Sequence, residues 1–350
     1  MKKISFFHIS DLLAGILISI LFFAGCEEDN PASPEEGGEG IYYVSISGDD
    51  DNDGLERETP FRTIGRAVEI VLPGDTIMIL PGVYNEGLFI ENYGDSDLPI
   101  TIMGADDGVV MDGKKSMEIG FWCEGCSNII FDNLELANYT DIGIGTYLSA
   151  DITLQNLTVH NNGSAVQLVD WELEGYGIHI DECSRVDIKS CNVYANGPDP
   201  AEPGMLGTGI NTYGCTDCNI QYNNTYQNTG GGILVEDGVR ILVEGNNVTA
   251  NFLDATEEGW WDGGIWVDGG HDVTVKNNIF QANIGPGIQI SDEDNQNPYG
   301  YVLEGNISSG NYYGIFIWNF GTTGFPPDNI LRMTNNQISE NSIQDVWIVP

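Results

Sequence analysis

The dipeptide Gly-Ile returns at a nearly constant spacing through the second half of the chain. Consecutive copies lie 32, 23, 32, 23 and 27 residues apart, and each opens a short segment of alternating apolar residues. The six copies are Gly177-Ile178, Gly209-Ile210, Gly232-Ile233, Gly264-Ile265, Gly287-Ile288 and Gly314-Ile315. One short strand per period of just over twenty residues is typical of a coil of a parallel solenoid.

A solenoid coil cannot bury its apolar side chains alone, so neighbouring coils must stack. Asparagines recur at the turns between strands, where amide side chains at one corner can hydrogen-bond from coil to coil. The alternative is an antiparallel sandwich, which needs hairpin turns rather than strands that recur at a steady coil length. The sequence therefore predicts an all-β, single-stranded parallel β-helix.

The start of the fold predicts one amphipathic helix, over roughly residues 60–71. Thr59 is placed to cap it, and Pro60 suits its first position. Its apolar face comprises Phe61, Ile64, Ala67, Val68 and Val71. Because the end of a solenoid exposes its core and its sheet edges, we expect this helix to cover that end.

Two stretches of this chain resemble a known family. The opening "YYVSISGDDDNDG", "PFRTIGRAV" and "PGDTIMILPGVY" is similar to the start of right-handed parallel β-helix proteins of the pectate-lyase-like superfamily. The repeat "DGGIWVDGG", followed by "KNNIF" and "GIQI", resembles the coils of that family. The resemblance implies a right-handed β-helix over residues 41–350. It does not fix an activity, since the fold hosts lyases, hydrolases, epimerases and proteins without known chemistry.

The first 25 residues are predicted to be a lipoprotein signal peptide. Lys2 and Lys3 precede a short apolar run that ends in "FFAGC", too short for a membrane span. This ending resembles a bacterial lipobox, which implies cleavage before Cys26 and lipid on its sulfur; a plain secretion signal is the alternative. Residues 26–40, rich in Glu, Pro and Gly, predict a flexible acidic tether. We therefore expect an exported protein, anchored by lipid in the outer membrane or at the cell surface.

The chain carries 53 acidic and 12 basic residues. Such a surface repels nucleic acid and anionic lipid, so neither is expected as a partner, and lipid anchorage is the only predicted membrane contact. The same charge repels polyanionic glycans unless a bound cation mediates the contact. We expect a monomer that takes a polysaccharide or oligosaccharide.

In each Gly-Ile strand the isoleucine and the residue two later are expected to point into the coil, and the intervening residues outward. Coils lie about 4.8 Å apart, so outward residues of equal register form columns. The first column reads His179, Asn211, Leu234, Trp266, Gln289 and Phe316, and the second reads Asp181, Tyr213, Glu236, Asp268, Ser291 and Trp318.

The second column predicts a catalytic carboxylate pair. Glu236 and Asp268 fall on adjacent coils, at a backbone separation near that used by retaining glycosidases, and Asp181 lies two coils before Glu236. Close like charges raise the pKa of one carboxyl, as an acid catalyst needs. The aromatic residues offer flat surfaces for sugar rings. The predicted substrate-binding residues of the columns are His179, Asn211, Tyr213, Trp266, Gln289 and Trp318.

Long insertions are expected to wall the columns on one side. The two 32-residue steps carry their extra residues between a turn asparagine and the next Gly-Ile, as "PDPAEPGMLG" and "FLDATEEGWWD". The segment "SAVQLVDWELEGY" is expected at the same edge, and "DEDNQNPYG" and "FGTTGFPPDN" at the other. Trp260, Trp261 and Asp262, in the second insertion, are further predicted substrate-binding residues.

Metal ions and disulfides are left open by the sequence. No metal ligand set is predicted, although calcium remains an open cofactor through acidic segments such as "GDDDNDG". Six cysteines follow Cys26, an even number that permits disulfides in an exported protein. Two Cys-x-x-Cys pairs, Cys123 with Cys126 and Cys215 with Cys218, lack the histidines of a zinc site.

The favoured function is a cell-envelope lipoprotein that binds an extracellular polysaccharide and hydrolyses it through a carboxylate pair on the outer face. One alternative is a calcium-dependent polysaccharide lyase. It is disfavoured because β-elimination needs a base such as Arg or Lys and the columns hold none: Arg185, Lys189, Arg240 and Lys276 lie in the following strands. The other alternative is a non-catalytic glycan-binding or scaffold protein, because outward carboxylates on a solenoid are often merely solvated.

Overall fold

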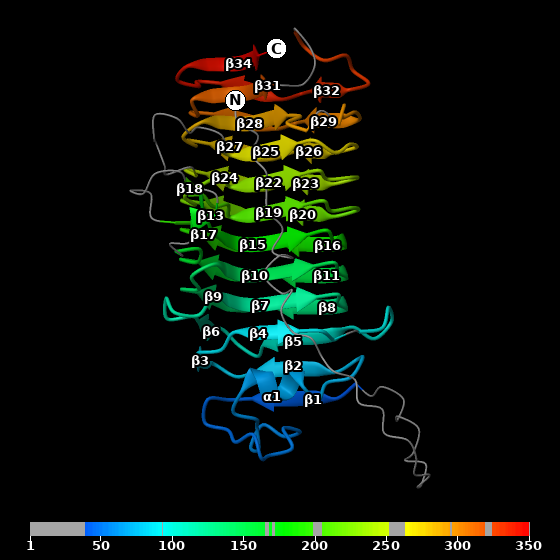
Figure 1. The fold of residues 1–350 in the computed structure, drawn as a ribbon, viewed down its shortest axis with the longest axis vertical. Helices are drawn as coiled ribbons and strands as arrows, with labels where there is room; N and C mark the ends of the chain where they lie inside the picture. The colour runs from blue at the N-terminus through cyan, green and yellow to red at the C-terminus, as the bar shows by residue number, and fades with distance from the viewer. Residues whose placement is uncertain are drawn as a thin grey trace. The chain divides into compact units, whose positions relative to one another are not determined.

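A computed structural model describes residues 39–92, 94–164, 168–169, 172–198, 205–251, 263–294, 296–318 and 324–349. The predicted signal peptide, Cys26 and nearly all of the predicted tether lie outside the described residues. The described residues wind into coils whose strands stack in three long sheets (Figure 1). Every strand pairing within these three sheets is parallel, as the Gly-Ile period predicted, and the antiparallel sandwich is excluded.

Sheet C takes the Gly-Ile strands. In chain order it comprises β4 (Leu88–Ile90), β7 (Ile119–Glu124), β10 (Ile142–Tyr147), β15 (Tyr176–Asp181), β19 (Ile210–Tyr213), β22 (Ile233–Glu236), β25 (Ile265–Asp268), β28 (Pro286–Ser291), β31 (Tyr313–Trp318) and β34 (Gln344–Val349). Neighbours in this order are hydrogen-bonded, so each Gly-Ile strand lies directly against the next one.

Sheet A follows sheet C in each coil. It comprises β1 (Ile41–Val44), β2 (Thr76–Ile79), β5 (Ile100–Gly104), β8 (Ser127–Asp132), β11 (Ala150–Gln155), β16 (Ser184–Lys189), β20 (Asn219–Gln221), β23 (Leu242–Glu244), β26 (Thr274–Lys276), β29 (Tyr301–Glu304) and β32 (Leu331–Thr334).

Sheet B completes the coil before the chain returns to sheet C. It comprises β3 (Gly82–Tyr84), β6 (Val109–Asp112), β9 (Glu135–Ala137), β12 (Thr158–His160), β17 (Asn192–Tyr194), β21 (Asn224–Tyr226), β24 (Asn247–Thr249), β27 (Ile279–Gln281), β30 (Ile307–Ser309) and β33 (Gln337–Ser339). The inward side chains of all three sheets form one apolar core, in which Ile178, Ile180, Val186 and Val193 represent a single coil.

Asparagine ladders hold two of the three corners. In the ladder before sheet C, Asn228 Nδ2 donates to Asn251 Oδ1 (2.9 Å) and to the Val193 carbonyl (3.2 Å), while its Oδ1 accepts from the Asn196 amide and backbone N–H. This ladder runs through Asn162, Asn196, Asn228, Asn251, Asn283, Asn311 and Asn341. The ladder between sheets A and B runs through Asn223, Asn246, Asn278, Asn306 and Asn336. The predicted turn asparagines therefore join the coils.

The glycine of each Gly-Ile pair is explained by the first ladder. A Cβ at Gly209 would lie 2.6 Å from Asn228 Nδ2, and a Cβ at Gly232 would lie 2.8 Å from Asn251 Nδ2. Both distances are shorter than real Cβ contacts, so any side chain at these corners would displace the ladder amide. The repeat is thus a packing signature, since only glycine leaves room for the asparagine beside it.

Small side chains occupy the third corner, between sheets C and A. Cys126 N–H donates to Ser149 Oγ (3.0 Å), and Ser149 N–H donates to Cys183 Sγ (3.3 Å). The six cysteines of the described residues are all buried, free thiols. Burial raises the pKa of Cys183 and Cys191 to about 12, so both stay protonated and donate to backbone carbonyls. None of these six cysteines forms a disulfide.

The N-terminal helix exists but is shorter than predicted. Helix α1 spans Ile64–Val68, and its N-cap is Thr63 rather than Thr59, with the Thr63 side chain accepting from the Arg66 N–H. Residue Phe61 stays extended instead, because its N–H and carbonyl pair with the backbone beside β1. Helix α1 packs on β1 and β2 and adds Ile64, Ala67 and Val68 to the core. Its role as a cover for the solenoid end stays a prediction.

Two insertions meet beside sheet C. A three-stranded sheet is formed by β13 (Leu168–Val169), β14 (Glu172–Glu174) and β18 (Met205–Leu206). Strands β14 and β18 come from the insertions of two consecutive coils and pair in parallel, with Leu173 opposite Met205. This pairing confirms that the segments "SAVQLVDWELEGY" and "PDPAEPGMLG" emerge at one edge. The insertion "FLDATEEGWWD" lies outside the described residues. Among the described residues, no helix is both long and apolar enough to cross a membrane.

The asparagine ladder yields a stability prediction. Asn228→Ala should lower the free energy of unfolding by about 3 kcal/mol, because several buried donors and acceptors lose their partner. The matched control is Asn224→Ala, since Asn224 is exposed on sheet B and its side chain donates only to Asn192 Oδ1. Urea unfolding followed by circular dichroism gives both values. Equal destabilisation of the two variants would contradict a special role for the ladder.

Candidate functional site

The strand register places both predicted columns on sheet C. His179 is paired with Asn211, Leu234 with Trp266, and Gln289 with Phe316. In the second column Asp181 is paired with Tyr213, and Glu236 with Asp268. The columns continue upstream through Trp122 and Tyr147. Trp122 follows Gly-Phe rather than Gly-Ile, whereas Tyr147 follows a further Gly-Ile pair, Gly143-Ile144, which the sequence analysis did not include. We call these two columns the outer strip.

The outer strip points out of the coil, yet most of it is buried. His179 is 8% exposed, Asp268 4% and Gln289 0%. The alternative that the outward carboxylates are merely solvated is therefore wrong for Asp268. Partial exposure is retained in the second column at Tyr213, Glu236 and Trp318. Of the two neighbouring carboxyl groups, that of Glu236 is therefore the more exposed and that of Asp268 the more buried.

Glu236 and Asp268 form an electrostatically strained pair. They occupy equivalent positions on adjacent parallel strands, about 4.8 Å apart at the backbone. Burial raises the pKa of Glu236 to about 9, and the nearby carboxylates of Asp268 and Asp237 add to that rise. Burial also raises the pKa of Asp268, but only to about 6, because hydrogen bonds oppose it. At pH 7 Glu236 is protonated and Asp268 is mostly ionised.

A hydrogen-bond relay holds Asp268 in place. Trp266 Nε1 donates to Ser291 Oγ (2.7 Å), and the Ser291 hydroxyl donates to Asp268 Oδ1. The Glu293 backbone N–H donates to the same oxygen (3.2 Å). Both donors favour the charged form of the carboxylate. Sequence reasoning placed Ser291 in the column but missed this role, which depends on the Trp266 side chain reaching one coil forward.

The loop after β28, which was expected to flank the columns, lies against the carboxylates of Asp268 and Asp237. Gln296 Nε2 donates to Asp237 Oδ1 (2.6 Å), and the Asp292 carboxylate accepts the backbone N–H groups of Gln296 and Asn297. Burial raises the pKa of Asp237. Asp237 is a neighbour of the site that the column analysis missed, since it follows the strand rather than belonging to it.

Asp181 is separated from the carboxylate pair. Tyr213 lies between Asp181 and Glu236 in the column, so Asp181 stands two coils, or about 10 Å, from Glu236. Burial and the neighbouring Glu236 raise the pKa of Tyr213 to about 12, which keeps its hydroxyl protonated as a donor. The structure brings together Glu236 and Asp268 of the three predicted catalytic residues, but not Asp181.

His179 belongs to an aromatic cluster at the other end of the outer strip. Its ring stacks on Tyr176, with ring centroids 4.7 Å apart, and on Trp122 at 6.3 Å. Burial lowers the pKa of His179 to about 4, so the ring is neutral at pH 7. Asn211 Nδ2 donates to His179 Nδ1 (3.0 Å), which places the ring proton on Nε2. His179 is thus a neutral donor rather than a proton carrier near pH 7.

Trp266 and Trp318 differ in how deeply they are buried. Trp266 is buried and its N–H serves the Asp268 relay, whereas Trp318 is only partly buried. The two rings lie 6.5 Å apart, tilted by 38°. The predicted substrate-binding roles of both stay predictions. Trp260, Trp261 and Asp262 lie outside the described residues.

The basic residues that follow the Gly-Ile strands lie on sheet A or in the turn before it, and they already have partners. Arg185 makes a two-pronged pair with Asp151 (both 2.7 Å), and Arg240 makes the same pair with Asp217 (both 2.6 Å). Lys276 lies 3.2 Å from Glu244. The described residues hold no cluster of three His, Cys, Asp or Glu side chains arranged for a metal ion, and calcium stays an open question.

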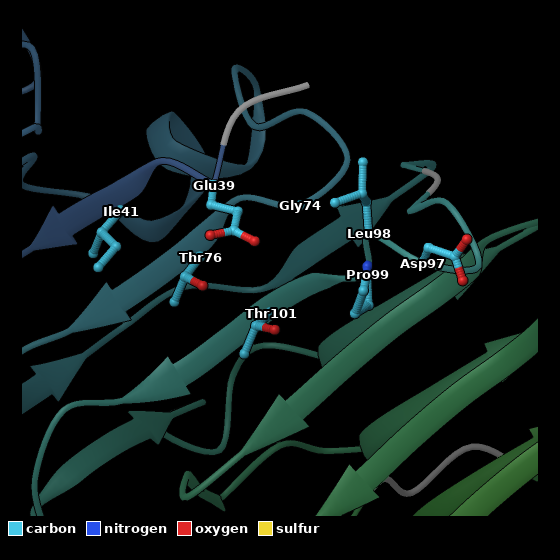
Figure 2. Close-up of a pocket in the computed structure, with 8 residues that line it drawn as sticks. All are labelled: Glu39, Ile41, Gly74, Thr76, Asp97, Leu98, Pro99 and Thr101. Carbon is cyan, nitrogen blue, oxygen red and sulfur yellow. The ribbon is translucent and has the colours of Figure 1, made fainter. Parts of the chain in front are cut away.

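A hollow of about 350 Å³ lies among the first coils, far along the chain from Glu236 and Asp268 (Figure 2). It opens over the edge of sheet A near its first strands. Its lining residues are Glu39, Ile41, Gly74, Thr76, Asp97, Leu98, Pro99 and Thr101. The hollow is open to solvent. The buried carboxyl groups with raised pKa values are instead on the outer strip, so we place the candidate site on that strip.

Comparison with known proteins decides the family. Residues 42–233 match the family described as "Pel9A-like, right handed beta helix region", and residues 174–349 match "Right handed beta helix region". The chain belongs to the right-handed β-helix family. The hand and the pectate-lyase-like character that the sequence suggested are thereby confirmed.

The relatives of this β-helix protein differ widely in sequence. The uncharacterized protein YwoF of Bacillus subtilis (strain 168) is 26% identical over 308 residues, which cover 78% of this chain and 63% of YwoF. This chain thus spans less than two thirds of that relative. Pectate lyase Pel9A has a similar structure, with a TM-score of 0.67 at 18% identity over 87% of this chain and 78% of its own.

Two further solved structures share the fold. XylC in complex with xylose has a TM-score of 0.60 at 13% identity, over 80% of this chain and 67% of its own. The GH136 lacto-N-biosidase of Eubacterium ramulus has a TM-score of 0.55 at 16% identity, over 89% and 67%. At such identities the likeness establishes the fold alone.

The raised pKa of Glu236 predicts a pH-dependent stability. Its pKa is about 9 in the folded protein against a usual 4.5, so between these values the folded state holds a proton that the unfolded chain has lost. The free energy of unfolding should therefore fall as pH rises from 4.5 to 9, by at most about 1.4 kcal/mol per unit. Glu236→Gln should flatten this dependence, and urea unfolding at pH 5, 7 and 9 measures it.

The control for that prediction is Glu304→Gln, because Glu304 is exposed on β29 of sheet A. It should leave the pH dependence of the parent protein unchanged. Parallel curves for the parent and Glu236→Gln would show that Glu236 ionises normally, and the proposed pair would lose its physical basis.

Proposed function

We propose that this protein binds an extracellular glycan along the outer strip and hydrolyses it with Glu236 and Asp268. The observation that supports this best is the adjacency of two carboxyl groups with opposite protonation states at pH 7. Such a divergence of pKa values is how one site supplies both an acid and a charged carboxylate. The glycan-directed names of the similar structures, among them a pectate lyase and a lacto-N-biosidase, agree with a carbohydrate ligand.

Glu236 is the proposed general acid. Its proton passes to the glycosidic oxygen as the bond to the leaving sugar breaks, while Asp268 attacks the anomeric carbon and forms a glycosyl ester. A water molecule then attacks that carbon, Glu236 takes a proton from the water, and Asp268 is released. The short separation of adjacent coils favours this retaining route, since inversion needs room for a water between the carboxyl groups.

If the proposed hydrolysis is right, substitution of either carboxyl group should inactivate the protein. Glu236→Gln and Asp268→Asn should each lower the release of reducing ends from the cleaved glycan by at least about 100-fold, while Glu304→Gln stays at the parental rate. A glycan panel digested by the full chain identifies the substrate and measures the rate. The parent's rate should rise through pH 6 as Asp268 ionises and fall through pH 9 as Glu236 does. Full activity of either variant would exclude this mechanism.

A polysaccharide lyase is the second candidate. It is favoured by the similarity to pectate lyase Pel9A and to a rhamnogalacturonan lyase, the latter with a TM-score of 0.50. Against it, no Arg or Lys occurs at the described positions of the outer strip, and the nearby sheet A cations are paired. A lyase would give unsaturated uronate products with ultraviolet absorbance in the same digestions, and a chelator would stop it if calcium were the missing cation.

A non-catalytic glycan-binding protein is the third candidate. The burial of Asp268 favours it, because a buried carboxylate held by Ser291 and the Glu293 N–H also serves structure. Under this alternative the panel would contain a bound glycan that no condition cleaves.

We also propose that the chain is a lipoprotein of the outer membrane or cell surface, anchored through Cys26. The proposal is supported by the "FFAGC" ending of the apolar leader and by the acidic stretch that follows it. Cells fed radiolabelled palmitate should label the parent protein, and Cys26→Ala should abolish the label. An unlabelled parent protein would instead favour plain secretion.

A further inference from the structure

Gln289 is a buried amide without a partner. It lies in the first column of the outer strip, between Trp266 on one neighbouring strand and Phe316 on the other. The residue is 0% exposed, and neither its Oε1 nor its Nε2 hydrogen-bonds to any described residue. Asn211, toward the other end of the column, is also a buried amide with an unpaired group. It is 3% exposed, its Nδ2 donates to His179 Nδ1, and its Oδ1 has no hydrogen-bond partner.

An unsatisfied buried amide destabilises a fold, so its presence needs a reason. Packing does not supply one, because Leu234 fills an equivalent position in the same column and methionine would match the volume of Gln289. Gln289 leaves open its carbonyl oxygen, an acceptor, and the two N–H donors of its amide nitrogen. A sugar hydroxyl can satisfy both types because it donates and accepts.

The charge of the outer strip favours uncharged sugars over acidic sugars as ligands. The strip carries Asp181, Glu236 and Asp268, and its described positions include no Arg or Lys. The carboxylate of a uronate would therefore enter a site with no opposite charge and with at least one ionised carboxylate nearby. An uncharged sugar ring experiences no such electrostatic repulsion.

We propose that Gln289 and Asn211 recognise the hydroxyl groups of a neutral oligosaccharide, which makes uncharged glycans rather than polyuronates the ligands of the outer strip. The proposal rests on the proposed glycan-binding function and names its substrate class. The two amides stand three coils apart, roughly 14 Å along the stack, which is farther than one sugar ring spans. The ligand is thus an oligosaccharide lying along the column.

Neighbouring groups fit this ligand. His179 beside Asn211 is neutral and carries its proton on Nε2, so it offers a donor without a charge. Trp318, partly exposed next to Phe316, offers an apolar ring face. Neither group provides the positive charge with which proteins hold carboxylates.

The test compares neutral and acidic oligosaccharides on the full chain. Calorimetric titration would use xylohexaose, cellohexaose and mannohexaose against hexagalacturonate and hexamannuronate, each with calcium and with chelator. We expect binding of at least one neutral hexaose and none of the uronates. Gln289→Met should weaken that binding about tenfold, by removing a hydrogen bond, and should leave the thermal unfolding midpoint unchanged or higher.

Gln281→Met is the matched control, because Gln281 is exposed on β27 of sheet B, away from the strip. It should bind like the parent protein. Preferred binding of a uronate, with or without calcium, would overturn the proposal, and so would a Gln289→Met protein that is more stable yet binds neutral hexaoses as before. Should the methionine variant fail to fold, the selectivity of the parent protein still decides between the two classes.

The same samples, assayed for reducing ends, separate this inference from the proposed hydrolysis. Neutral binding that depends on Gln289 but leads to no cleavage would leave the inference standing and exclude the hydrolase. Cleavage of a uronate that depends on Glu236 would do the reverse. Absence of binding and cleavage across the panel would overturn both.

Discussion

The coil-to-coil hydrogen bonds of the asparagine ladders are the interaction on which the remaining structure depends. An interior ladder amide such as that of Asn228 bonds the next coil through the neighbouring asparagine side chain and the previous coil through a backbone carbonyl, in full burial. These bonds fix the register of one coil on another, and the Gly-Ile glycines give them room. A slip of one residue would turn every outward side chain inward. The position of Glu236 beside Asp268 is therefore set at a corner of the coil, away from the site itself.

Burial gives the outer strip its chemical character. On an exposed sheet face, Glu236 and Asp268 would both ionise and their interaction would be screened by solvent. Covered as they are, the two carboxyl groups respond differently, because Asp268 has the Ser291 hydroxyl and the Glu293 N–H while Glu236 faces other carboxylates. The same burial keeps His179 neutral and leaves Gln289 without solvent as a hydrogen-bond partner. The proposed acid chemistry and the proposed selection of uncharged ligands thus share one physical cause.

The few basic side chains of this acidic chain include two arginines that are paired with aspartates of neighbouring coils. Arg185 and Arg240 belong to a column of alternating charges at the turn before sheet A. Each makes a bidentate salt bridge to the aspartate of the preceding coil. They stabilise stacking and are unavailable to a substrate. A chain with 12 basic residues among 350 thereby leaves the described outer strip without positive charge, and this separates it chemically from a site built for polyanions.

The sequence by itself determined the parallel coils, the ladder asparagines and the pairing of Glu236 with Asp268, because a strand period of two and a nearly constant coil length fix which residues stack. It overestimated the length of helix α1, where pairing of Phe61 with β1 overrode helical periodicity. Only the tertiary structure decided that the outer strip is buried, that Ser291 links Trp266 to Asp268, and that Gln289 lacks a partner. These features depend on side-chain reach and on burial, which arise from contacts between coils distant in sequence and leave no periodic trace in the chain.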